Sequence, residues 1–185
     1  KILPNNNGGA ALESDFAVYI NEVLSSWGLH ELTAGLYNVS ENTLPGYTPS
    51  VWEGACDDNG AITIVAGEDY TCTITNDDEP GTLIVEKVIE GSDASPEDFS
   101  FMINEDDPSV FEPDGSNELS VSAGTYTVTE LLDENYTASY DNCEDIEIGN
   151  GETATCVITN TYLPPPPPPP EPTDTTPPAS QFDNS

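Results

Sequence analysis

Short runs in which polar and apolar side chains alternate make up most of the chain up to residue 162. These runs are rich in Thr, Val, Ile and Tyr, and clusters of Gly, Pro, Asn and Asp separate them. Because successive side chains of a strand point to opposite faces, such alternation indicates strands with one buried face. The pattern therefore predicts an all-β fold built from β-sandwiches.

The chain contains an internal repeat, in which the same motifs follow one another in the same order and at similar spacing. This order predicts two domains in tandem, residues 1–79 and 80–163, rather than a solenoid. Each domain would hold about 80 residues, a size at which a β-domain gains from a covalent link. The matching segments are 15–20 and 98–103, 34–41 and 123–130, 46–48 and 135–137, and 72–76 and 156–160.

One segment of the first repeat permits a second interpretation. Residues 11–27 are dense in apolar side chains and would also suit a helix. The matching segment of the second repeat, residues 99–103, has the pattern of a strand, so we predict β structure in both. We expect Trp27 and Trp52 to pack in the protein rather than to bind a ligand.

The end of the chain has a different composition. Seven consecutive prolines occupy positions 164–170, and further prolines follow. A run of this length favours polyproline II, which would give a stiff spacer of roughly 20 Å. We therefore predict that residues 164–185 form a polyproline spacer and a polar tail rather than a third domain.

The charge of the chain is almost entirely of one sign. It has 35 Asp and Glu residues and only two basic residues, which gives a formal net charge of −33. Such a surface repels nucleic acids and anionic lipids, so we expect neither as a partner. High salt, divalent cations or low pH would each reduce the self-repulsion, and the sequence does not choose among them. We find no apolar stretch long enough to span a membrane.

The two basic residues are lysines that begin the two repeats at equivalent positions. Each repeat also has a glutamate and an asparagine that strand alternation places on the apolar face. A buried charge is costly unless it is paired or neutralised, so the repeated set needs a common explanation. The set is Lys1, Glu41 and Asn76 in the first repeat and Lys87, Glu130 and Asn160 in the second.

A covalent bond between the lysine and the asparagine would explain this set. Burial should leave a neutral amine beside a protonated acid. The amine could then attack the asparagine side-chain carbonyl while the acid moves protons, and ammonia would leave. Two simpler arrangements are a buried lysine–glutamate ion pair with the asparagine as a neighbour, and a lysine and an asparagine at solvated strand ends. The alternation disfavours solvated ends.

The four cysteines allow three pairings, but the repeat favours one local disulfide in each domain. These would join Cys56 to Cys72 and Cys143 to Cys156. We predict no metal site, because CxxC spacing is absent and the single histidine, His30, has no second ligand nearby in the sequence. Structural disulfides persist in oxidising compartments, so they indicate an extracellular protein.

The motifs around these residues resemble those of CnaB-type (SpaA-like, prealbumin-like) domains of bacterial surface proteins and pilins. The family's Tyr-Thr-Val-Thr-Glu segment occurs at residues 126–130 and, in weaker form, at residues 37–41. Its closing Ile-Thr-Asn motif occurs at residues 74–76 and 158–160. The resemblance covers nearly all of residues 1–162 and implies Ig-like or prealbumin-like sandwiches with self-formed isopeptide bonds. By this resemblance, the bonds would join Lys1 to Asn76 with help from Glu41, and Lys87 to Asn160 with help from Glu130.

The two repeats differ before the lysine. Residues 81–86 precede Lys87, but the sequence has no residue before Lys1, so we predict a truncated first strand in the first domain. An incomplete sheet edge offers unpaired backbone groups to another strand. A neighbouring subunit could donate that strand, for which residues 179–185 are a candidate. Simple truncation of a longer multidomain protein is the alternative.

Together these features predict an extracellular structural protein, a self-associating subunit or repeat of a surface filament, pilus or stalk. The residues of a turnover active site are missing, so we do not expect an enzyme beyond the self-reaction. The alternative function is an adhesive or calcium-dependent binding module, with residues 21–31 as its recognition loop. Acidic clusters could hold a structural calcium ion, but they lack EF-hand spacing, and solvated loops are their default interpretation. These clusters are residues 57–58, 77–79 and 105–107.

Overall fold

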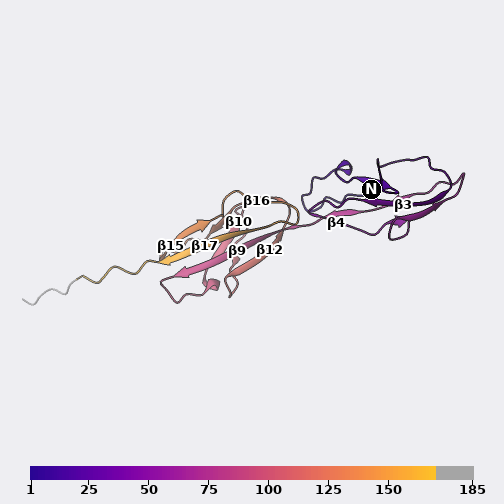
Figure 1. Cartoon of the computed structure of the whole chain (residues 1–185). Helices are drawn as coiled ribbons and strands as arrows, with labels where there is room; N and C mark the ends of the chain where they lie inside the picture. Colours follow the sequence, from indigo (N-terminus) through magenta and orange to yellow (C-terminus); the bar gives the residue numbers. More distant parts are fainter. Residues whose placement is uncertain (170–185) are drawn as a thin grey trace, which may run out of the picture.

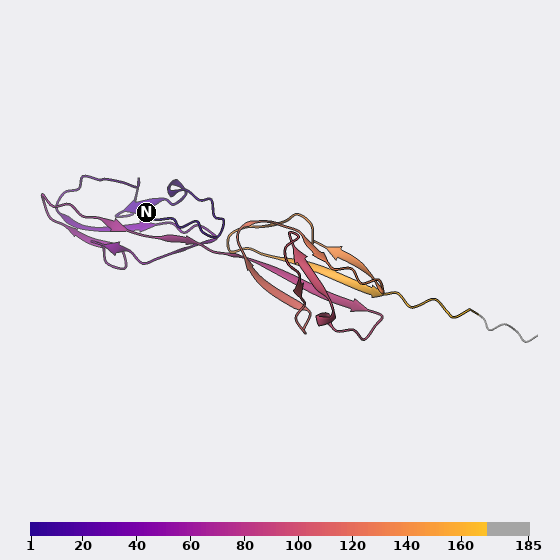
Figure 2. The same cartoon turned by 180° about the vertical axis from the view of Figure 1, so that it is seen from behind.

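The structure, a computed structural model, describes residues 1–169 and consists of two β-domains joined end to end (Figure 1). Each domain is elongated along its strands, and the second domain leads into the proline segment at its far end (Figure 2). Within the described residues, the only helical elements are two 3₁₀ turns. The all-β prediction is therefore confirmed.

Strands β1–β8 form the first domain and strands β9–β17 form the second. In the first domain the elements are η1 (Glu13–Asp15), β1 (Val18–Ile20), β2 (Val23–Ser25), β3 (Gly35–Glu41), β4 (Tyr47–Pro49), β5 (Glu53–Gly54), β6 (Ala61–Ile64), β7 (Cys72–Thr73) and β8 (Asn76–Asp78). In the second they are β9 (Gly81–Glu90), η2 (Pro96–Asp98), β10 (Ser100–Ile103), β11 (Ser109–Val110), β12 (Ser116–Val121), β13 (Gly124–Tyr126), β14 (Val128–Glu130), β15 (Tyr136–Asp141), β16 (Ile146–Ile148) and β17 (Thr153–Tyr162).

The second domain is organised around two long parallel strands, β9 and β17. They pair over residues 82–90 and 153–161, in a register that places Ile158 opposite Lys87. Strands β12 and β15 extend this sheet at its two edges, while β11, β10 and β14 form a separate sheet. The first and last strands of the domain therefore lie side by side.

The first domain repeats this plan with shorter strands, in one sheet β2-β1-β3-β6 and two ladders, β4-β8 and β5-β7. Ile2 forms a parallel bridge with Thr75, which places Lys1 beside Ile74, the counterpart of Ile158. Ahead of Lys87, β9 contributes residues 81–86 to the sheet. The matching edge of the first domain, beside β7, has no strand paired with it on that side among the described residues.

The candidate recognition loop, residues 21–31, begins with the same turn as the matching segment of the second domain. Asn21 and Glu22 have φ of +50° and +67°, and Asn104 and Glu105 have φ of +50° and +65°. Two successive left-handed residues are typical of a type I′ hairpin turn. In each turn the asparagine side chain accepts a backbone N–H from the neighbouring strand. Both repeats therefore make the same turn, which weakens the case for a recognition loop there.

Each domain has its own apolar core. The core of the second domain is larger and joins its two sheets, since Leu83 and Ile158 of one sheet cluster with Phe101 and Val128 of the other. The core of the first domain is smaller, and several large apolar side chains of that domain remain exposed. The buried members of the smaller core are Val18, Trp52, Cys56, Ile62 and Ile74.

One disulfide lies within each domain, Cys56–Cys72 in the first and Cys143–Cys156 in the second. This confirms the local pairing that the repeat predicts. The second cysteine of each pair lies on the last part of its domain, four residues before the asparagine of the predicted crosslink. The disulfide and the candidate isopeptide residues therefore involve the same stretch of chain.

Residues beyond β17 add no regular structure in the described part of the chain. Positions 164–169 are exposed prolines, so the polyproline II spacer stays a prediction. Pro170 and the predicted polar tail, including the donor segment 179–185, lie outside the described residues. Within residues 1–169, no helix is both long and apolar enough to cross a membrane.

Replacing Leu83 with Ala tests the core of the second domain. The Leu83 side chain is fully buried beside β17, so we expect the L83A variant to lose about 2–5 kcal/mol of unfolding free energy. Leu132 is 85% exposed, and L132A serves as the matched control with a change near zero. Denaturant unfolding of both variants measures the difference. Equal stabilities would contradict this description of the core.

Candidate isopeptide site

Three strands of the second domain bring one lysine, one glutamate and one asparagine together. Lys87 lies on β9, Glu130 on β14 and Asn160 on β17, and all three residues are buried. The Nζ atom of Lys87 lies 2.5 Å from Oε1 of Glu130. The Nδ2 atom of Asn160 donates to the same oxygen at 3.2 Å. A single carboxylate oxygen therefore bridges the amine and the amide.

The positions of these residues follow from strand alternation. On β9, Lys87 lies on the buried face with Leu83 and Val85. On β17, Asn160 shares the buried face with Cys156, and the neighbouring threonines are less buried. The burial pattern thus agrees with the faces inferred from the sequence.

The first domain assembles the equivalent residues. The Nζ atom of Lys1 lies 2.6 Å from Oε2 of Glu41, and the two side chains are almost fully buried. Asn76 begins β8 and is 1% exposed. Unlike Asn160, its amide has no hydrogen bond to the glutamate. The lysine–glutamate pair is therefore common to both domains, and the bridge to the asparagine is present in the second.

Aromatic rings surround each lysine amine. Lys1 Nζ lies 3.9 Å from the ring centroid of Phe16 and 5.1 Å from that of Trp27. In the second domain, the amine lies 4.6 Å from Phe99 and 5.5 Å from Phe111. These rings exclude water from the amine and also attract its charged form.

The aromatic enclosure of the amine was not predicted from the sequence. Phe16 and Phe99 occupy the same place in the repeat and were a detectable signal. The second ring of each enclosure is Trp27 in the first domain and Phe111 in the second. Because the two residues differ in type, comparing the repeats for identical residues does not reveal them. Trp27 does pack as predicted, since it stacks on Trp52 with ring centroids 6.3 Å apart. Its contact with the lysine is an additional role.

Burial changes the acid–base behaviour of both lysines. Loss of solvation lowers the pKa of Lys87, and the hydrogen bond and charge of Glu130 oppose this effect without cancelling it. The pKa of Lys1 is lowered for the same reason, with Glu41 in the opposing role. A lowered pKa makes the neutral amine, which is the nucleophilic form, more accessible at a given pH.

Several buried polar atoms at these sites have no hydrogen-bond partner among residues 1–169. They are Oδ1 of Asn160, both side-chain polar atoms of Asn76, and Oε1 of Glu41. An unpaired buried polar group costs roughly 1–3 kcal/mol, so native proteins seldom retain one without a reason. The unpaired atoms belong to the amide that would react and to the acid that would assist it.

The chain matches one known domain family in both of its repeats. The sequence model of the SpaA prealbumin-like fold domain matches residues 21–74 and again residues 78–161. The chain belongs to this family. Prealbumin-like domains of this kind are structural and non-enzymatic.

Solved structures similar to this chain include Gram-positive surface proteins and pilins. The Bacillus anthracis TIE protein is 15% identical, and the match covers 84% of this chain and 42% of that protein at a TM-score of 0.40. A minor pilin of Streptococcus agalactiae is 15% identical, with 76% of this chain and 66% of the pilin covered at a TM-score of 0.36. The C-terminal fragment of the pilus adhesin SpaC from Lactobacillus rhamnosus GG is 15% identical, with 86% and 95% covered at a TM-score of 0.39. The chain thus spans only part of the first two proteins. No curated protein sequence matches it.

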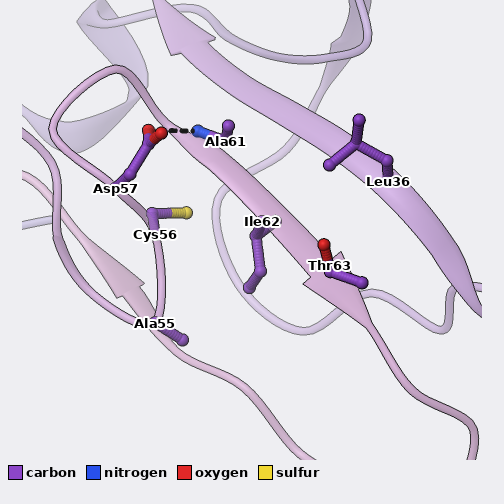
Figure 3. Close-up of a pocket in the computed structure, with 7 residues that line it drawn as sticks. All are labelled: Leu36, Ala55, Cys56, Asp57, Ala61, Ile62 and Thr63. Carbon is purple, nitrogen blue, oxygen red and sulfur yellow. Dashed lines mark hydrogen bonds between the residues drawn. The ribbon is translucent and has the colours of Figure 1, made fainter.

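The first prealbumin-like domain has an open depression of about 470 Å³ on its surface (Figure 3). Leu36 of β3 lines it, together with Ile62 and Thr63 of the neighbouring strand β6. The carboxylate of Asp57 also lines it, but Oδ1 already accepts the backbone N–H of Ala61 at 2.8 Å. None of the candidate isopeptide residues borders the depression. It lacks the convergent free polar groups that are typical of a ligand site.

Two residues of the acidic clusters considered for calcium, Asp57 and Asp78, accept backbone hydrogen bonds. Asp57 stabilises its own turn, and Asp78 is buried and accepts three backbone N–H groups. In residues 1–169, no three His, Cys, Asp or Glu side chains lie together in a way that could hold a metal ion. The geometry therefore gives no support to a calcium site at these clusters.

The lowered pKa of Lys87 predicts how stability depends on pH in a variant that cannot form the bond. In N160A the amine of Lys87 remains free. Its pKa is lowered in the folded protein, whereas in the unfolded chain it is about 10.4. Between these two pKa values the unfolded chain binds more protons than the folded protein. The unfolding free energy of N160A should therefore rise with pH across that alkaline window. Denaturant titrations at several pH values measure the slope.

The control for this experiment is the double variant K87M/N160A, which lacks the amine but keeps every other titrating group. Subtracting its pH profile removes the contribution of the tyrosines, which also ionise in this range. A difference profile that is flat, or that falls with rising pH, would contradict the inferred state of Lys87.

Proposed function

We propose that the chain is an extracellular structural part of a surface filament, pilus or stalk, whose two domains are each closed by an isopeptide bond. The bonds join Lys1 to Asn76 and Lys87 to Asn160. The observation that carries this proposal is that the lysine, glutamate and asparagine side chains are buried in both domains, while asparagine amide atoms have no hydrogen-bond partner among the described residues. A buried ion pair alone would explain the lysine and the glutamate, but it would not explain why Oδ1 of each asparagine is buried without a hydrogen-bond partner among the described residues.

The reaction needs only groups within each domain. The neutral Nζ of Lys87 attacks Cγ of Asn160, and a C–N bond forms as the carbonyl becomes tetrahedral. Glu130 accepts a proton from the attacking nitrogen and delivers it to the departing Nδ2, which leaves as ammonia. The short contacts of one Glu130 oxygen to both nitrogens support this role. The product is a neutral secondary amide, and no oxidant or cofactor is consumed.

The position of the bond suits a protein that bears a pulling force. The first and last strands of the second domain are parallel neighbours, and the chain enters at Gly81 and leaves at Tyr162. A pull on the two ends would therefore shear β9 against β17. A bond from Lys87 to Asn160 would carry the load through covalent atoms before the hydrogen bonds of this pair are strained. This is the expected behaviour of a filament subunit.

Other features support an extracellular setting. Each domain carries one disulfide, which is typical of oxidising compartments. The chain has no arginine, and both lysines are buried, so proteases that cut at basic residues find no exposed site. The pilins among the similar structures agree with this setting.

We also propose that the first domain can accept a strand from a neighbouring chain. Residues 69–71 precede β7 and are exposed, whereas their counterparts in β17 pair with the first half of β9. A strand in line with Lys1 and Ile2 would pair with residues 69–71, as the first half of β9 pairs with β17 in the second domain. Donation between copies would link subunits into a polymer.

The crosslinks can be tested by the intact mass of the reduced, denatured chain. We expect a single species lighter than the sequence mass by two molecules of ammonia. E130A should lose only the bond of the second domain, so its deficit should fall to one ammonia. E118A removes an exposed glutamate of β12 and serves as the control with the full deficit. A chain with no deficit would disprove the crosslinks, and a ladder of multiples would show that they join subunits instead.

The strand site can be tested with a six-residue peptide that has the sequence of residues 81–86, Gly-Thr-Leu-Ile-Val-Glu. We expect it to shift the amide resonances of Thr71 and Thr73 in NMR spectra of the whole chain, because it would pair with their backbone. In the control peptide, Asp replaces both the Leu and the Val, which correspond to the buried residues Leu83 and Val85. Unchanged resonances with the first peptide would exclude strand addition and leave the crosslink proposal intact.

A further inference from the structure

The two domains meet at a buried carboxylate that has no part in the isopeptide sites. Asp78 ends β8 and is 2% exposed. Its side-chain oxygens accept the backbone N–H groups of Asn6, Asn7 and Gly9 at 2.9, 2.8 and 2.7 Å. The carboxylate therefore holds the N-terminal loop of the first domain against the end of β8.

This carboxylate remains charged without a basic partner. Burial by itself would raise the pKa of Asp78, but the backbone donors of Gly9, Asn7 and Asn6 outweigh it and hold the pKa below its usual range. Hydrogen bonds to the charged form of a carboxyl group favour that form. Asp78 is therefore a fixed acceptor at neutral pH.

The second domain reaches Asp78 through Asn150, in the turn between β16 and β17. The Nδ2 atom of Asn150 lies 2.8 Å from the carbonyl oxygen of Glu79, 3.1 Å from that of Asn7, and 3.3 Å from Oδ2 of Asp78. An amide has two N–H hydrogens, so the two shorter contacts are the main bonds and the third is shared. One side chain thus contacts the linker, the N-terminal loop and the end of β8.

The backbones of the two domains also approach closely around Asn150. The N–H of Ala123 donates to the carbonyl oxygen of Asn7 at 2.7 Å. Gly46, at φ +76°, lies so near that a Cβ would be 2.4 Å from the carbonyl oxygen of Asn150. Gly8, at φ +81°, would place a Cβ 2.6 Å from the carbonyl oxygen of Ala123. Both glycines are therefore required for this contact as well as for their turns.

The opposite ends of the two domains lack the matching groups. The turn of residues 65–68 is the counterpart of residues 149–152, because in each the last N–H donates to the first carbonyl. Ala66 takes the place of Asn150 in that turn. Tyr162 takes the place of Asp78 at the end of β17. The amide and the carboxylate therefore occur once each, at the two ends that face each other.

We propose that Asn150 and Asp78 form a lock that holds the two domains as one rigid body and that is specific for this order of domains. If two copies of the chain were placed end to end, Tyr162 of one copy would approach Ala66 of the other. Ala66 has no side-chain amide to donate, and Tyr162 has no carboxylate to accept. The rigid unit is therefore the pair of domains, and any further unit joined at its ends would be held by other contacts.

Residual dipolar couplings of the whole 185-residue protein test the lock. We expect both domains of the native protein to fit a single alignment tensor. In N150A, which removes the bridging amide, the two domains should fit tensors of different magnitude. N38A is the matched control, because Asn38 makes its side-chain bond within the first domain, and it should keep the single tensor.

A second variant separates loss of the lock from loss of folding. D78N removes the charge that organises the N-terminal loop, and it should also separate the two tensors. The dispersed amide spectrum of each domain reports whether the fold is retained in both variants. Two tensors in the native protein, or a single tensor in a folded N150A, would overturn the proposal.

Discussion

Each domain depends on the burial of a lysine amine against a carboxylate and two aromatic rings. In a chain with 35 acidic side chains, the two lysines could have formed surface ion pairs at little cost, yet both lie inside. Burial removes the hydration of the amine, and only a partner of opposite charge or a covalent change can compensate for it. In each domain, two other parts of the chain bring the glutamate and the asparagine to the amine; in the second domain they are strands β14 and β17.

The parallel pairing of the first and last strands fixes this geometry. Lys87 and Asn160 lie on neighbouring strands two register positions apart, since Ile158 is opposite Lys87 and Asn160 is opposite Ile89. Glu130 approaches from the other sheet, so its carboxylate reaches across the core to both. A shift of one residue in the pairing of β9 and β17 would turn the asparagine away from the amine. The register of one strand pair therefore determines whether the site exists.

Much of this arrangement could be predicted from the sequence, because alternation and duplication are local signals. The faces of Lys87, Glu130 and Asn160 follow from a period of two, and the pairing of cysteines follows from the repeat. The aromatic enclosure was missed, since Trp27 and Phe111 reach the amine through the fold and differ in type. The contact between the domains was missed for a related reason: Asn150 and Asp78 interrupt the repeat, and only tertiary structure brings them together.

The side-by-side position of β9 and β17 also sets the order of folding. These strands are separated by nearly the whole domain, so their pairing is a contact of high sequence separation that forms slowly. Until β17 has been synthesised, β9 has no parallel partner and Lys87 has no asparagine carbonyl within reach. The sheet of the second domain can therefore close only after its last strand is available. If the proposed bond forms, it can form only in a domain whose last strand is already in place.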